Sequence, residues 1–225
     1  MRARISAILA TSLLAFSIVG PASAADNTSK WRDGFPAASA IDANLGNYKR
    51  APNIEISNFT GRWYACSQVR ANATTAIATA NYQPTPLTQS IVQADARVYA
   101  STAKAKAAFD VLASKLKKCA GSRVEVSEPG SRDKWRVSIS VGEVPSVTDG
   151  GVPSLFVYSR ESPAKGSTLS KANSASSYEI ITLSGTALLL ATGDVAGVSK
   201  LTTAQRDSVV SFASDFVGTW TKANS

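Results

Sequence analysis

Two stretches of the sequence carry apolar residues at the three- and four-residue spacing of an amphipathic helix. The first, residues 102–120, follows a capping residue at Ser101 or Thr102 and ends before Gly121. Its apolar positions are Ala105, Ala108, Phe109, Leu112, Leu116 and Cys119. The second follows a capping box, and its apolar positions are Val209, Phe212, Ala213, Phe216, Val217 and Trp220. We predict a helix at each place, with one side turned to a core.

Other segments alternate apolar and polar residues, which is the two-residue period of a half-buried strand. Along residues 91–99 the apolar side holds Val92, Ala94, Ala96 and Val98, and the polar side holds Gln93, Asp95, Arg97 and Tyr99. Further strand-like runs are 123–127, 134–141, 154–159, 178–183 and 186–191. Ser184-Gly185 predicts a tight hairpin turn between the last two runs. Residues 72–88, with Pro84 and Pro86, predict a long connection.

These elements define the expected architecture. We predict an α+β fold in which a twisted antiparallel β-sheet carries two main helices packed on one face. Residues 61–225 form this single domain, and residues 25–60 form a loosely ordered N-terminal arm. The Gly-, Ser- and Pro-rich segment 161–177 is either the rim of a binding groove or a plain mobile loop.

The start of the chain has the features of an export signal. Arg2 and Arg4 precede a mostly apolar stretch over residues 5–19, and Ala22-Ser23-Ala24 offers small residues for cleavage. We predict a signal peptide over residues 1–24. The apolar stretch is shorter than the roughly 20 residues of a spanning helix, so we expect a secreted or cell-envelope protein without an integral membrane span.

Composition excludes several classes of function. The 225 residues include no histidine and two cysteines, so the histidine-dependent catalytic triads and the usual zinc ligand sets are absent. We therefore expect no enzyme activity, no metal and no cofactor. The formal net charge of +8 suits attraction to anionic envelope polymers or lipids, and equally a solubility role. The basic residues form no dense patch, so nucleic acid is not an expected partner.

The two cysteines are expected to pair. Outside the cytoplasm thiols generally form disulfides, and Cys66 to Cys119 is the single intramolecular pair available. We interpret it as a structural staple that joins the end of the first helix to the segment around Cys66. A redox-active pair would need a close-spaced motif such as C-x-x-C, which the sequence lacks.

The polar side of the predicted sheet supplies the candidate binding residues. They are Arg97, Tyr99, Arg136, Tyr158 and Arg160. Guanidinium groups bind oxyanions in a fork, and tyrosine adds an apolar ring with a hydroxyl, so the set suits an anionic or sugar-containing ligand. The alternative is an ordinary solvated sheet face. The partner is an unknown small molecule or envelope component, and the oligomeric state is open.

Two rival functions remain. Ser101-Thr102-Ala103-Lys104 has the S-x-x-K spacing of serine–lysine hydrolases, but the same spacing recurs at Ser114, Ser131 and Ser162, and the K-T-G and S-D-N motifs are missing. The other rival is an envelope structural or interaction protein that docks through residues 31–48.

The stretch from Ala96 to Phe109, with Leu112, Leu116 and Cys119-Ala120-Gly121 after it and a tryptophan-containing strand at Trp135, carries a family resemblance. It resembles the extracytoplasmic sensor domain of mycobacterial PknH-type serine/threonine kinases and its stand-alone secreted or lipoprotein relatives. The resemblance implies helices against a twisted antiparallel sheet, a cleft proposed to bind an unidentified ligand, and an actinobacterial cell envelope as the setting. This chain lacks a kinase domain and the second cysteine pair that members commonly carry near residues 161–177.

Overall fold

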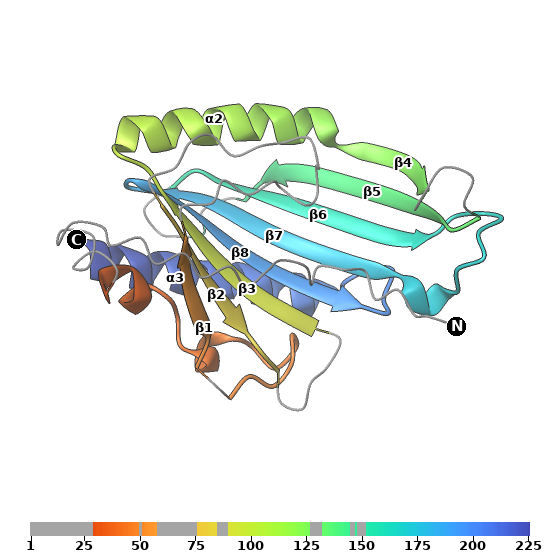
Figure 1. The fold of residues 1–225 in the computed structure, drawn as a ribbon, viewed down its shortest axis with the longest axis horizontal. Helices are drawn as coiled ribbons and strands as arrows, with labels where there is room; N and C mark the ends of the chain where they lie inside the picture. The colour runs from red at the N-terminus through yellow and green to blue at the C-terminus, as the bar shows by residue number, and fades with distance from the viewer. Residues whose placement is uncertain are drawn as a thin grey trace.

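An antiparallel sheet of eight strands forms the body of the protein (Figure 1). The computed structural model describes residues 29–49, 51–57, 76–84, 90–126, 132–144, 147 and 152–225. The strands are β1 (Asn53–Ser57), β2 (Ala76–Tyr82), β3 (Ser90–Val98), β4 (Gly121–Val126), β5 (Lys134–Glu143), β6 (Ser154–Pro163), β7 (Ala175–Ser184) and β8 (Ala187–Ala196). Their order across the sheet is β1-β2-β3-β8-β7-β6-β5-β4, so two meanders join where β3 pairs with β8.

The two long helices begin where the sequence predicts. Helix α2 (Thr102–Cys119) starts after Ser101, whose hydroxyl accepts a hydrogen bond from the Lys104 backbone N–H at 3.3 Å. Helix α3 (Thr203–Asn224) has a capping box in which Thr202 and Gln205 each accept a backbone hydrogen bond from the other. The described residues also contain a short helical segment at 29–33 and two 3-10 helices, η1 (Ala38–Ala40) and η2 (Lys171–Asn173). The α+β class with an antiparallel sheet is confirmed.

The placement of both helices on one face is wrong. The side chain of Leu189 packs in the cluster that contains α3, whereas Leu188 and Leu190 pack in the cluster that contains α2. Successive residues of a strand point to opposite faces, so the two helices cover opposite faces of the sheet, as Figure 1 also shows. The reason lies in β8, where an unbroken run of leucines supplies apolar side chains to both faces.

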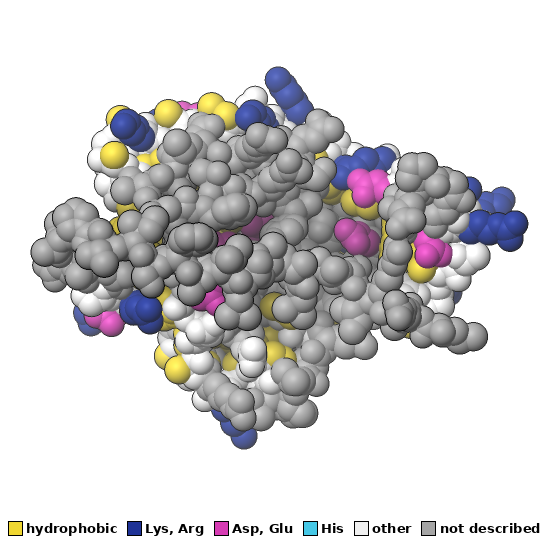
Figure 2. Space-filling view, in the orientation of Figure 1, with side chains coloured by type: hydrophobic (Ala, Val, Ile, Leu, Met, Phe, Trp, Pro, Cys, Tyr) yellow, Lys and Arg dark blue, Asp and Glu magenta, His cyan; other side chains and the backbone are white. Residues whose placement is uncertain are grey.

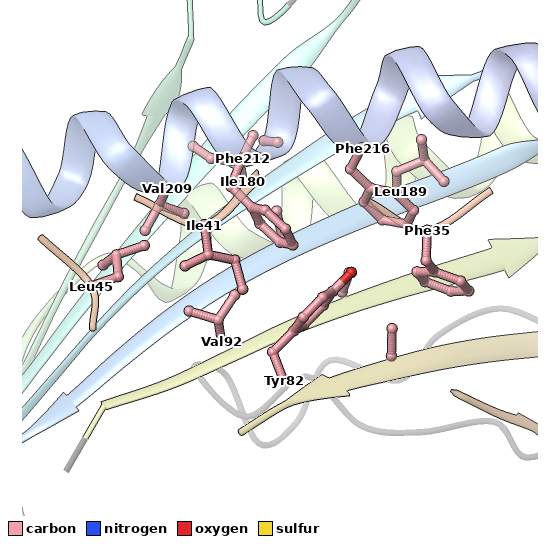
Figure 3. Packing of buried hydrophobic residues seen from close by; sticks show 14 of the residues in the cluster. Phe35, Ile41, Leu45, Tyr82, Val92, Ile180, Leu189, Val209, Phe212 and Phe216 are labelled. Atoms are coloured by element: carbon pink, nitrogen blue, oxygen red, sulfur yellow. The ribbon is translucent and has the colours of Figure 1, made fainter. Parts of the chain in front are cut away.

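The loosely ordered arm expected over residues 25–60 is also not what the structure shows. Phe35, Ile41, Leu45 and Tyr48 are buried between the sheet and α3. Figure 3 shows Phe35, Ile41 and Leu45 lying among the core side chains of α3 and the sheet. The described residues 35–48 are therefore part of the core.

Residues 76–82 form β2 rather than part of a long connection. This strand is rich in alanine, and Ala78 and Ala80 are fully buried, so short side chains bring β2 close to the core. The predicted signal peptide and Cys66 lie outside the described residues. Among the residues that the structure describes, no helix is long and apolar enough to cross a membrane.

Candidate functional site

The five predicted binding residues lie on two faces of the sheet. Arg97 and Tyr99 belong to the face that α2 covers, since Arg97 lies opposite Leu188 of β8 and Tyr99 packs in the α2 cluster. Both side chains are buried, and burial raises the pKa of Tyr99. Tyr99 is therefore a core residue. The side of β3 that the sequence marks as polar is only partly exposed to solvent.

Arg136, Tyr158 and Arg160 lie together on the opposite face, toward one end of the sheet. Arg160 lies opposite Ser138 of β5, and its Nη2 donates a hydrogen bond to the Ser138 hydroxyl at 3.2 Å. Arg136 lies opposite Ser162, two residues farther along β6. The two arginines are thus diagonal neighbours on adjacent strands. The structure brings three of the five candidates together.

Tyr158 acts as a platform for two guanidinium groups. The Cζ atom of Arg160 lies 5.5 Å from the ring centroid, and that of Arg206 in α3 lies 5.7 Å from it. The Tyr158 hydroxyl accepts a hydrogen bond from the Leu201 backbone N–H at 2.9 Å. Its ring is buried and its hydroxyl is engaged, so Tyr158 orients cations rather than offering its own ring to a ligand.

Both guanidinium groups keep unused donors. Within the described part of the chain, the Nε atoms of Arg160 and Arg206 are buried without a hydrogen-bond partner. A buried donor without a partner costs free energy, so an acceptor brought to these atoms would be favoured. Arg206 also donates from Nη2 to the Thr203 hydroxyl at 3.3 Å, which holds its side chain along the first turn of α3.

A pocket of about 640 Å³ opens beside these residues. It is lined by Ser162, Pro163, Lys171, Ser174, Gly197, Val198, Ser199 and Lys200. Two hydrogen bonds fix its wall: the Gly197 N–H donates to the Ser174 carbonyl at 2.7 Å, and the Ser176 hydroxyl donates to the Val198 carbonyl at 3.2 Å. Ser176 lies directly opposite Arg160, so the arginine is next to the pocket wall.

The pocket and its surroundings are positively charged. The cations are Arg136, Arg160, Lys171, Lys200 and Arg206, and none of them forms an ion pair with another described residue. The lining contains no acidic side chain. The first turn of α3, which starts just after Lys200, adds the positive end of the helix dipole. We call these five cations and the eight lining residues the basic pocket.

Sequence reasoning missed Lys171, Lys200 and Arg206. Lys200 and Arg206 flank the capping box at Thr202, so their place at a helix start was readable from the sequence. Lys171 lies within the segment 161–177, and no local pattern connects it to the other two. Sheet pairing and the packing of α3 bring them together.

The opposite face carries acids instead. Asp95, Glu179 and Asp194 lie on the α2 side of β3, β7 and β8, beyond the apolar area under the helix. Burial raises the pKa of Glu179 to about 8, with Asp95 and Asp194 adding to the shift and Arg97 opposing it. Burial also raises the pKa of Asp194. A protonated Glu179 side chain carries no charge, so it attracts cations weakly below the raised pKa.

Figure 2 views the molecule from the side away from α3 and shows acidic side chains on this face between the grey residues, with lysines and arginines toward the rim. Within the described ranges, no group of three or more cysteine, aspartate or glutamate side chains could hold a metal ion.

Comparisons with known proteins assign the chain to a class. Residues 56–179, more than half of the sequence, match the family model of the PknH-like extracellular domain, and the chain belongs to this family. It is therefore an extracytoplasmic, sensor-type domain. The family expected from residues 96–121 and Trp135 is confirmed.

A solved structure shows the same fold. The chain is similar to the crystal structure of the extracellular domain of PknH from Mycobacterium tuberculosis, with a TM-score of 0.55 and 14% sequence identity. The similarity covers 82% of this chain and 93% of that chain. A search of curated proteins finds no match.

Proposed function

We propose that this protein is a non-catalytic sensor-type domain of the cell envelope that binds an anionic ligand in the basic pocket. One observation carries the proposal: Arg160 and Arg206 are held against Tyr158, beside a pocket that two lysines line, and their buried Nε donors have no partner among the described residues. Cations that form no ion pair with a described residue favour a negatively charged occupant.

The chemistry of the pocket favours oxyanions. A guanidinium group offers parallel N–H donors that match phosphate or carboxylate oxygens, and lysine adds a compact positive charge. Hydroxyl groups of Ser162 and Ser199 in the lining can donate further hydrogen bonds. A volume of about 640 Å³ suits a small molecule or a headgroup rather than a folded partner. The ligand is thus a phosphate- or carboxylate-bearing small molecule or envelope component.

The surroundings of Ser101 support a non-catalytic role. Its hydroxyl accepts the Lys104 backbone N–H as the cap of α2, and the Lys104 side chain is exposed. A serine nucleophile needs a base held within hydrogen-bond reach. Because Ser101 caps α2 and the Lys104 side chain is exposed to solvent, we interpret the S-x-x-K spacing as a helix start rather than a catalytic motif.

The proposal is tested by titrating the purified protein with inorganic pyrophosphate and, separately, with citrate. Calorimetry during each titration measures the affinity for the anion. Arg160→Gln combined with Arg206→Gln removes two cations at the platform, and Lys171→Gln combined with Lys200→Gln removes two at the exposed lining. Each pair should weaken binding by about tenfold or more, since a hydrogen bond to a charged group contributes about 1.5–3 kcal/mol. Lys104→Gln with Lys118→Gln, which removes the same charge from α2, should leave affinity within about twofold.

Vesicles of phosphatidylglycerol distinguish a lipid headgroup from a free anion. Binding to vesicles that depends on the same four cations assigns the headgroup as a source of ligand. An equal loss of affinity in the control variant, Lys104→Gln with Lys118→Gln, would show that only the net charge of the protein matters. If neither the anions nor the vesicles bind, the proposed function is refuted.

A further inference from the structure

Among the described residues, strand β4 has a paired strand on one side only and forms an edge of the sheet. It pairs with β5 and ends the strand order, and residues 121–125 are all exposed. Val124 is 53% exposed, more than any other large hydrophobic residue in the described ranges. An edge strand presents a row of backbone N–H and C=O groups that another strand can bind. The run from Gly121 to Val126 contains no proline that would block such pairing.

The charges of β4 are arranged to complement a second copy. Arg123 and Glu125 point to the same face of the sheet, and the Arg123 Nε donates to the Glu125 carboxylate at 2.6 Å. If two β4 strands run antiparallel with Val124 opposite Val124, each Arg123 lies opposite a Glu125 of the other copy. Opposite charges in such cross-strand pairs are stabilising.

The same charges exclude the neighbouring registers. Sliding the two strands so that Arg123 faces Arg123, or Glu125 faces Glu125, places like charges directly opposite each other, which is destabilising. A slip by one residue would turn Arg123 and Glu125 to the wrong face. One antiparallel register is therefore favoured, and it is symmetric.

We propose that two copies of this protein pair through β4, antiparallel and about a two-fold axis at Val124. The pairing joins two eight-stranded sheets into one continuous sheet. It closes on itself, because each copy uses its own β4 edge and the contact is the same from both sides. A single short strand buries little area, so the dimer forms at high protein concentration and weakens with salt. The inference is independent of the basic pocket.

A charge exchange tests the register. Sedimentation velocity of the purified protein over a range of about 10 μM to 1 mM should show a monomer–dimer equilibrium. Arg123→Glu and Glu125→Arg each place like charges across the axis and should weaken association by about tenfold or more. The double variant, Arg123→Glu with Glu125→Arg, restores opposite charges and should recover the dimer. Thermal unfolding of each variant checks that the monomer is intact.

A cross-link tests the axis separately. Val124→Cys places two thiols opposite each other across the two-fold axis, within disulfide range, and should give a covalent dimer on mild oxidation. Val111→Cys, at a residue of α2 that is 41% exposed, is the matched control and should stay monomeric. A wild-type protein that is monomeric at 1 mM, or a double variant that stays monomeric, would overturn the proposal. Equal cross-linking at both positions, or oligomers that grow beyond the dimer, would also overturn it.

Discussion

Glu179 shows how a single side chain makes the stability of this protein depend on pH. It lies on β7 opposite Thr192, and burial raises its pKa from 4.5 to about 8. Between these values the folded state keeps a proton that the unfolded state releases. The folded state then binds more protons, so the free energy of unfolding falls as pH rises through this range.

Glu179→Gln keeps the size and the hydrogen-bonding groups of the protonated acid but cannot ionise. We expect the variant to equal the wild type near pH 5 and to be more stable at pH 8, with a slope against pH that is shallower by up to about one proton. Urea unfolding at pH 5, 6.5 and 8 measures this. Glu55→Gln, on the exposed side of β1, is the control and should keep the wild-type slope. Parallel slopes for Glu179→Gln and the wild type would contradict the assignment.

The contact between α3 and β8 shows how closely the elements are fitted. A Cβ atom added at Gly193 would lie 2.6 Å from Cγ2 of Val209, which is far too close. Gly193→Ala should therefore destabilise the protein by about 1–3 kcal/mol through overpacking. Adding Val209→Ala removes the clashing methyl groups, so the double variant should lose less stability than the sum of the two single changes.

Denaturant unfolding of the three variants gives the coupling free energy. Gly218→Ala serves as the control, because no atom lies within 4 Å of the added Cβ and alanine favours the helix. It should stabilise by about 0.5–1 kcal/mol. Additive losses at Gly193 and Val209 would show that α3 can shift away from β8.

The sequence predicts where each helix begins and ends, but it does not predict which face of the sheet the helix covers. Caps and apolar spacing are local signals, and Ser101 and Thr202 act as the caps that the sequence indicates. Which face a helix covers depends on strands far away in the sequence. The run Leu188-Leu189-Leu190 was the available signal that both faces of β8 are covered. Strand β2 was missed because alanine carries little strand preference.

The predicted disulfide between Cys66 and Cys119 would join two distant parts of the chain. Cys119 is the last residue of α2 and packs partly buried against the α2 cluster, while Cys66 lies outside the described residues. We expect peptide mapping to find the two cysteines linked. The bond would close a loop of 54 residues, so Cys66→Ser with Cys119→Ser should lower the free energy of unfolding by about 4 kcal/mol. Two free thiols in the purified protein would contradict this pairing.

The binding site could be predicted only in part, because its residues come from segments that lie far apart in the sequence. Arg136, Tyr158 and Arg160 were readable as a polar surface, and adjacent strands keep them together. Arg97 and Tyr99 have the same kinds of side chain but lie on the other face. Alternation separates the two sides of one strand, but it does not show which side of another strand belongs to the same face of the sheet. Lys171 and Arg206 come near the pocket because η2 packs on β6, while α3 packs on β7 and β8 and places Arg206 over Tyr158.

The junction of β3 with β8 has a consequence for how the chain is made. The first meander, β1 to β3, is synthesised early, but its inner edge is completed only when residues 187–196 arrive. A polypeptide that crosses a membrane from its N-terminus must hold that edge unpaired until almost its last segment has emerged. The edge of β3 lacks its partner until β8 has been made, and an unpaired strand edge is open to pairing with wrong strands.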